Sequence, residues 1–159
     1  DRSPTFTGTV SGVTATHVGL GNVTNESKTT MFTSPTFTGT TTLQQSTEIM
    51  NTINGATGTV THDFSTGAIW RHFPEANFTA NFTNVPTTNN RAIAVTLVII
   101  QGSTAYIPNA VQIDGLSQTI RWQDNTVPTG NVDKGDVFNF VLLRGVGSWT
   151  VLGSMSTYG

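Results

Sequence analysis

The hydrophobic and polar residues follow two different patterns along the 159-residue chain. From about Thr59 onward, short stretches rich in Val, Ile, Phe and Trp alternate with turns rich in Gly, Asn and Asp, which is typical of β-strands joined by short loops. Helical turns are expected only at 48–53 and 25–31. The predicted strands are 58–65, 68–73, 77–85, 91–102, 110–115, 118–123, 136–145 and 148–156.

Three features of these strands indicate how they pack. Residues 77–85 (NFTANFTNV) alternate strictly, which predicts that the Phe and Ala side chains face inward and that the Asn and Thr side chains face outward. Residues 92–100 and 137–143 are apolar on both faces, so they are expected to be central strands. The dipeptide Asp114-Gly115 predicts a hairpin between 110–115 and 118–123. The segment 46–159 is therefore predicted to be an all-β head domain, an antiparallel β-sandwich.

Residues 1–45 have a different pattern, in which isolated apolar residues are spread through Thr, Ser and Gly. The phrase SPTFTGT occurs twice, at 3–9 and 34–40, with one Phe in each copy. Phe6 and Phe37 are too widely spaced from other apolar residues to close a core within one chain, so this segment needs a partner to bury them. We therefore predict a fibrous stalk; a flexible Thr/Gly linker is the alternative.

The composition excludes several classes of protein. Charged residues make up only 10% of the chain and the net charge is −2, so an electrostatic nucleic-acid site is not expected. The chain has no Cys, which excludes disulfides and thiolate metal sites. No apolar run is long enough for a membrane span, so membrane insertion is not expected.

The segment 16–32 (THVGLGNVTNESKTTMF), flanked by the two SPTFTGT units, resembles the repeats of bacteriophage tail-fibre and related virion-fibre proteins. The segment from 55–70 (GATGTVTHDFSTGAIW) to 154–159 (SMSTYG) is similar to the C-terminal domain of structural proteins from marine cyanobacterial phages. This resemblance implies a homotrimer with a β-rich tip, located in the virion and joined to other virion proteins through a missing N-terminal part. Three chains side by side would stack Phe6 and Phe37 in layers on the trimer axis, with Leu20 and Val23 as a further layer.

No pattern of residues indicates catalysis, a cofactor or a metal. His62-Asp63 lacks the H-x-H or H-x-x-x-H spacing of a metal site, so the histidines are expected to be structural or on the surface. Asp124, Asp133 and Asp136 could approach Ca²⁺, but their spacing is not that of an EF-hand. No spacing selects a carboxylate pair for glycoside hydrolysis, and G-x-S-x-G is absent. The chain is therefore not expected to be an enzyme.

Recognition is expected in a loop, because long loops on a rigid β scaffold commonly carry binding residues. The segment 123–136 (QDNTVPTGNVDKGD) is long, polar and rich in Gly and Pro. Trp122 and Trp149 are expected in the core, Trp70 could lie on either side, and Tyr158 is expected to be exposed. The candidate receptor contacts are Asp124, Asn125, Asn131, Asp133 and a more exposed Tyr106. The sequence thus favours a tail-fibre tip that adheres to a host-surface glycan or protein. A purely structural virion component, such as a head or collar fibre or a decoration protein, is the alternative.

Overall fold

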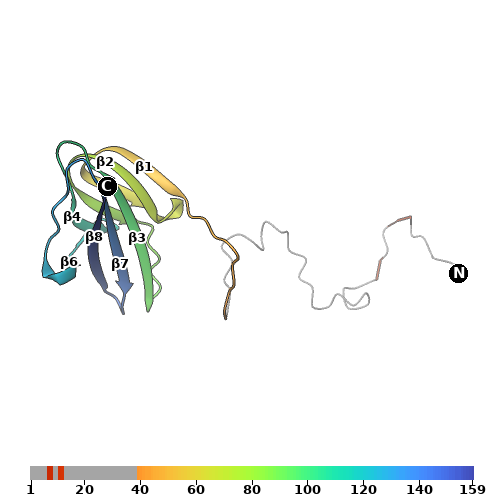
Figure 1. Ribbon diagram of the computed structural model, residues 1–159. Helices are drawn as coiled ribbons and strands as arrows, with labels where there is room; N and C mark the ends of the chain where they lie inside the picture. The colour runs from red at the N-terminus through yellow and green to blue at the C-terminus, as the bar shows by residue number, and fades with distance from the viewer. Residues whose placement is uncertain (1–6, 9–10, 13–38) are drawn as a thin grey trace. The chain divides into compact units, whose positions relative to one another are not determined.

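The structure of the protein is a computed structural model that describes residues 7–8, 11–12 and 39–159 (Figure 1). The chain divides into two units, Asp1–Gln44 and Gln45–Gly159, and we call the second unit the head. All described strands belong to the head. The predicted helical turns at 25–31 lie outside the described residues, as do the residues predicted to pack on a trimer axis, Phe6, Leu20, Val23 and Phe37.

The described part of the chain consists of strands and loops, with no α-helix. Two short 3-10 helices, η1 (Phe64–Thr66) and η2 (Gln123–Asn125), follow strands. No helix in this part of the chain has the length and apolar character needed to cross a membrane. The prediction of an all-β head is confirmed. The strands are β1 (Met50–Asp63), β2 (Ile69–Thr83), β3 (Arg91–Ile100), β4 (Pro108–Ile113), β5 (Leu116–Gln118), β6 (Ile120–Trp122), β7 (Gly135–Arg144) and β8 (Trp149–Tyr158).

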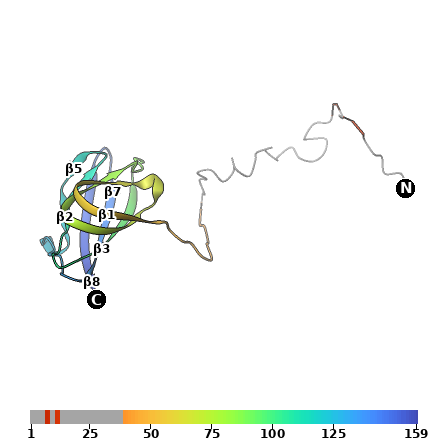
Figure 2. The ribbon, with the colours of Figure 1, turned by 90° about the horizontal axis from the view of Figure 1, so that it is seen from above.

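The first strands of the head form a parallel coil. Met50 of β1 pairs with Ile69 of β2, and Ile69 pairs in turn with Thr96 of β3. The three strands therefore lie side by side here and run in the same direction. The second half of β2 leaves β3 and pairs with β4, beginning with Phe78 beside Pro108. Both ribbon views show β1 and β2 as curved strands that wrap around the head (Figures 1 and 2). The sheet therefore folds over on itself into a barrel-like sandwich.

The bend in β1 has a local cause. The pairing of β1 with β2 shifts register between Asn54 and Ala56 and again between Ala56 and Gly58. Gly55 and Gly58 have φ of 64° and 62°, a backbone conformation that glycine adopts without steric cost. The bulges therefore turn β1 from one layer of the sandwich into the other.

The predicted antiparallel arrangement is wrong for more than half of the strand pairs. The sheet order is β5-β4-β2-β3-β7-β8-β6, with β1 also on β2. The pairs β3–β7, β4–β5 and β7–β8 are antiparallel, whereas β1–β2, β2–β3, β2–β4 and β6–β8 are parallel. The reason is that β1 and β2 bend and cross from one layer of the sandwich to the other. The next strand can therefore begin beside the start of the previous one and run parallel to it, without a helix between them.

The core lies between the two layers and is rich in aromatic side chains. Phe78, Ala80 and Phe82 of β2 are buried, which confirms the predicted alternation. Phe138 and Phe140 of β7 face them, and the ring centroids of Phe82 and Phe140 are 6.0 Å apart. Burial of each Phe side chain contributes about 1.5–3 kcal/mol. These aromatic contacts hold the coil against the antiparallel part of the sheet.

Several predicted element boundaries are corrected by the structure. Residues 48–53, predicted as helical turns, enter β1 at Met50. The predicted strands 68–73 and 77–85 form the single bent strand β2. The Asp114-Gly115 turn exists, but it joins β4 to the short β5, and the Trp122 strand β6 pairs with β8 instead. The change of partner occurs at Thr119, the one residue between β5 and β6.

Candidate functional site

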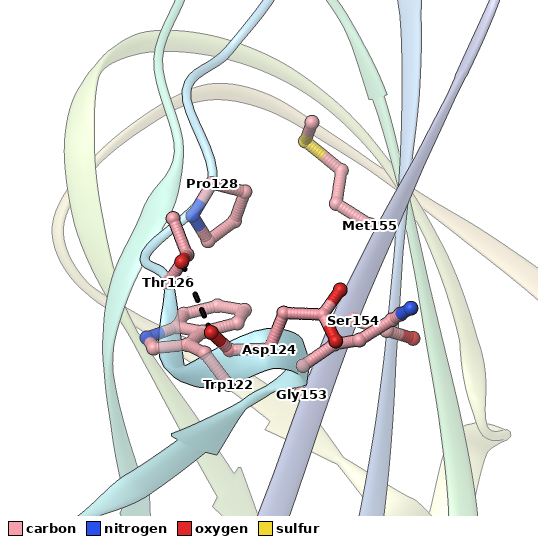
Figure 3. A pocket seen from close by; sticks show the side chains of 8 residues that line it. Trp122, Asp124, Thr126, Pro128, Gly153, Ser154 and Met155 are labelled. Atoms are coloured by element: carbon pink, nitrogen blue, oxygen red, sulfur yellow. Dashed lines mark hydrogen bonds between the residues drawn. The ribbon is translucent and has the colours of Figure 1, made fainter.

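A hollow of about 390 Å³ lies where β6 ends and the loop to β7 begins. We call it the Trp122 hollow. Figure 3 shows Pro128 and Met155 at its top and Trp122, Asp124 and Gly153 below them. It is lined by Trp122, Gln123, Asp124, Thr126, Pro128, Gly153, Ser154 and Met155. An aromatic ring, a carboxylate, an amide and hydroxyls thus meet in one concave place.

The position of Trp122 depends on a glycine in the next strand. Trp122 pairs with Gly153 of β8, and a Cβ added at Gly153 would lie 2.8 Å from two atoms of the indole ring. Any larger residue at 153 would therefore displace the ring. The indole also contacts the core, at 6.2 Å from the centroid of Phe138 and 5.8 Å from that of Phe140. Trp122 is half-buried, so it packs on the core, as predicted, and also lines the hollow.

Asp124, which supplies the carboxylate of the hollow, has a left-handed backbone conformation. Asp124 and Asn125 both have positive φ, 53° and 54°, and both are exposed. Asn and Asp tolerate this left-handed conformation better than most residues. The Thr126 hydroxyl donates a hydrogen bond to the Asp124 carbonyl over 3.1 Å, and the Thr126 N–H donates to the Gln123 carbonyl over 3.2 Å. These bonds fix the turn that presents Asp124 to the hollow.

The second half of the loop is fixed by a buried carboxylate. Asp136 is fully buried and accepts hydrogen bonds from the Asn131 N–H at 2.8 Å, Asn131 Nδ2 at 3.0 Å, Gln101 Nε2 at 2.9 Å and Thr157 Oγ1 at 2.9 Å. Burial alone would raise the pKa of Asp136, but the hydrogen bonds from Asn131, Gln101 and Thr157 together outweigh it and lower the pKa. Asp136 therefore serves as an internal anchor that ties the loop to Gln101, directly after β3, and to Thr157 of β8.

The five predicted contact residues do not share one place. Asp124 lines the hollow, and Asn125 is its exposed neighbour. The Asn131 side chain is half-buried and already bonded to Asp136 and Thr157, so it supports the loop from within. Asp133 is exposed but does not line the hollow, and Tyr106 lines a separate hollow of about 290 Å³.

Tyr106 is half-buried, although the sequence indicated a more exposed side chain. The Gln101 side chain holds the backbone of Tyr106 from both sides, because Nε2 donates to the Tyr106 carbonyl over 2.8 Å and the Tyr106 N–H donates to Oε1 over 3.0 Å. The link between β3 and β4 is thereby fixed. Tyr158, by contrast, is exposed as predicted, and Trp70 lies in the core.

Next to the Trp122 hollow lies a second hollow of about 350 Å³. The two share Trp122, Gln123, Gly153 and Ser154, so these residues form the wall between them. The second hollow adds Arg121, Asn139, Val141 and Leu152.

The sequence did not reveal a pair of buried histidines. His62 in the second half of β1 and His72 in the first half of β2 are both fully buried, and their Nε2 atoms are 3.0 Å apart. Trp70, Phe78 and Phe82 surround the two rings. Burial, with the neighbouring His72, lowers the pKa of His62 to about 3, and burial lowers that of His72 to about 4. No short motif could show this pair, because only the bend of the two strands brings the rings together.

The Trp122 hollow lacks the carboxylate pair of a glycoside hydrolase. Asp124 is the only carboxylate that lines it, whereas glycoside hydrolysis uses two carboxylates across the scissile bond. Among the described residues, no group of three or more His, Cys, Asp or Glu is arranged to hold a metal ion. No protein-family model, curated protein or solved structure matches the chain.

Proposed function

We propose that the chain is part of a homotrimeric phage virion fibre whose head attaches to the host surface through the Trp122 hollow. The repeated SPTFTGT units support the fibre, and the segment that leads into β1 supports the association of chains. In this segment Leu43 and Ile49 are each 68% exposed and Met50 is 48% exposed, so a single chain leaves them unburied. Exposed apolar side chains close together in sequence favour a contact with other chains.

The combination of Trp122, Asp124 and Ser154 around one hollow is the observation that carries this proposal. The apolar face of a sugar ring can stack on an indole, while carboxylate and hydroxyl groups bond to the sugar hydroxyls. A surface glycan of the host is therefore the ligand that fits best. The proposed activity is binding without catalysis, and a host-surface protein is the other receptor that the exposed polar loop could contact.

Three heads on one fibre would strengthen a weak site. Once one head has bound, the other two are held near the same surface, which raises their effective concentration. The fibre would join other virion proteins through residues N-terminal to the stalk, and no nucleic acid, membrane insertion or cofactor is part of the proposal. An individually weak site is thus sufficient for attachment to a cell that carries many copies of the glycan.

Binding of the fluorescently labelled 159-residue chain to susceptible cells tests the proposal. Asp124→Ala should weaken binding at least tenfold, because one lost charge-assisted hydrogen bond is worth about 1.5–3 kcal/mol and three heads multiply the loss. The matched control is Asp133→Ala. Asp133 has φ of 56°, close to the 53° of Asp124, and is exposed in the same loop, so alanine adds the same backbone strain without altering the hollow.

The two variants distinguish the outcomes. Weaker binding by Asp124→Ala but not by Asp133→Ala supports the hollow. Equal binding by all three proteins would remove the hollow as the receptor site. No binding by the unmodified chain to any susceptible host would instead favour a purely structural role in the virion.

A further inference from the structure

A different hollow, of about 360 Å³, lies where β3 begins, β7 ends and β8 begins. In Figure 1 this is the end of the sheet toward which the β7 arrow points. We call it the arginine hollow. It is lined by Asn90, Arg91, Ala92, Leu143, Arg144, Gly145, Ser148 and Thr150. No carboxylate is among these residues, although the chain as a whole has a net charge of −2.

The two arginines are direct neighbours. Arg91 of β3 pairs with Arg144 of β7 in the antiparallel register, so the two side chains leave the same face of the sheet at adjacent places. Like charges directly opposite each other in a sheet repel. An anion between the two guanidinium groups would turn this repulsion into attraction.

Contacts within the chain hold both arginines at the hollow. The Arg144 guanidinium lies 4.9 Å from the centre of the Trp149 ring, and its buried Nε has no hydrogen-bond partner. Arg91 Nη1 donates to the Asn90 carbonyl over 3.3 Å, and the Asn90 N–H donates to the Arg144 carbonyl over 2.8 Å. The Arg144 guanidinium is therefore placed before any ligand arrives, which lowers the entropic cost of binding, while the exposed Arg91 is tied only to the neighbouring carbonyl.

The other groups around the hollow complete a set of donors. Ser148 supplies a hydroxyl and Asn90 supplies an amide, whereas Thr150 pairs with Leu143 and so leaves the opposite face of the sheet from the arginines. The turn is closed by a bond of 3.0 Å from the Gly145 N–H to the Ser148 carbonyl. Guanidinium groups bind phosphate, sulfate and carboxylate through two parallel N–H···O bonds, and hydroxyls take the remaining oxygen atoms.

We propose that Arg91 and Arg144 form an oxyanion-binding site, separate from the Trp122 hollow, that takes a phosphate group. The group is either free phosphate or a phosphate carried by a sugar, and both present the same oxygen atoms to the two guanidinium groups. The site is independent of the proposed attachment function, since it uses neither the loop 123–136 nor Trp122.

Titration of the full 159-residue chain, followed by calorimetry and by the melting temperature, tests the site. The ligands are inorganic phosphate and glucose 1-phosphate at pH 7.5, with chloride at equal ionic strength as the reference. We expect millimolar binding of phosphate and a melting temperature that rises with its concentration. Arg91→Gln should weaken binding at least tenfold, because the exposed Arg91 supplies half of the charge. At low salt without phosphate, this variant should melt no lower than the unmodified protein.

Arg71→Gln is the matched control. Arg71 also lies over an aromatic ring, 5.4 Å from the centre of Phe73, and its buried Nε also lacks a partner, but it does not line the arginine hollow. Unchanged phosphate binding by Arg71→Gln together with the loss in Arg91→Gln supports the site. Tighter binding of glucose 1-phosphate than of phosphate identifies a sugar phosphate as the ligand, and equal binding identifies the free oxyanion. No phosphate binding, or an equal loss in both variants, would overturn the proposal.

Discussion

Acid should destabilise the head through the pair His62 and His72, well above the pH at which its carboxylates titrate. An Nε2···Nε2 distance of 3.0 Å requires one ring to donate and the other to accept. Because burial lowers both pKa values, the two imidazoles are neutral at pH 7 and have different tautomers. Both Nδ1 atoms are buried without a partner, and aromatic side chains surround the rings. Protonating one ring would bury a charge, and protonating both would also set two Nε2–H donors against each other and break the bond between them.

The size of the effect follows from the difference between folded and unfolded protein. An unfolded histidine titrates near pH 6.5, whereas burial lowers the pKa of His62 to about 3 and that of His72 to about 4. Below pH 6.5 the unfolded chain binds more protons than the folded one, so stability is lost as the pH falls and the loss ends near the folded pKa values. Between pH 7.5 and 5 each histidine should cost about 2 kcal/mol, or about 4 kcal/mol for the pair. Small domains have a total stability of about 5–15 kcal/mol, so this is a large share.

Unfolding by guanidinium chloride at pH 7.5 and pH 5, followed by tryptophan fluorescence, measures this loss. The control is the double variant His62→Leu/His72→Leu, which keeps a similar side-chain volume and removes both titrating groups. We expect its free energy of unfolding to change by less than about 1 kcal/mol over the same pH range. Asp136 does not interfere, because its pKa is lowered and its contribution is lost only at more acidic pH. An unmodified protein that is equally stable at both pH values would refute the reasoning, as would a double variant with the same loss.

Three further predictions concern the stalk, the hollow and the loop anchor. Phe37→Ser should lower the melting temperature of the trimer far more than Thr38→Ser, since loss of a buried Phe costs about 3–5 kcal/mol at each site; similar melting temperatures would contradict axial packing. Gly153→Ala should push the Trp122 ring from its place, with a shift in tryptophan emission and weaker cell binding, because the added Cβ would lie 2.8 Å from the ring. Asp136→Asn should lower the free energy of unfolding at pH 7 by about 2–3 kcal/mol, because an amide cannot accept all four hydrogen bonds; a loss below 0.5 kcal/mol measured by denaturant titration would show that the anchor is dispensable.

The sequence predicted the parts of the fold that depend on local alternation. Phe78, Ala80 and Phe82 are buried at the positions that a period of two predicts, and the Asp114-Gly115 turn is where its residues indicate. The start of β1 was missed because Met50–Gly58 contains mostly Asn, Thr and Gly and buries only Ala56. Strand pairing also could not be read from the sequence, since the choice of β8 as the partner of β6 depends on residues far away in the chain.

The candidate site was predicted only in part for the same reason. Asp124 of the loop 123–136 does line a hollow, but the sequence could not tell that Ser154 and Met155 of β8 complete it. Nor could the sequence tell that the Asn131 side chain would donate hydrogen bonds to Asp136 and Thr157, because these two residues come together only in the fold. Polar composition marks a loop only as a candidate binding segment and does not say which of its side chains are free.

The parallel coil determines when the head can fold. β2 needs β3 and β4 beside it, and Phe82 of β2 meets Phe140 only after β7 has been synthesised. Contacts between residues far apart in sequence slow folding, because the chain must close long loops before it gains their energy. We expect the head to fold slowly and only after β8 has left the ribosome. During that delay residues 1–45 of several chains are already available to one another, so the order in which the proposed stalk and the head mature would be set by β7 and β8, the last strands of the head.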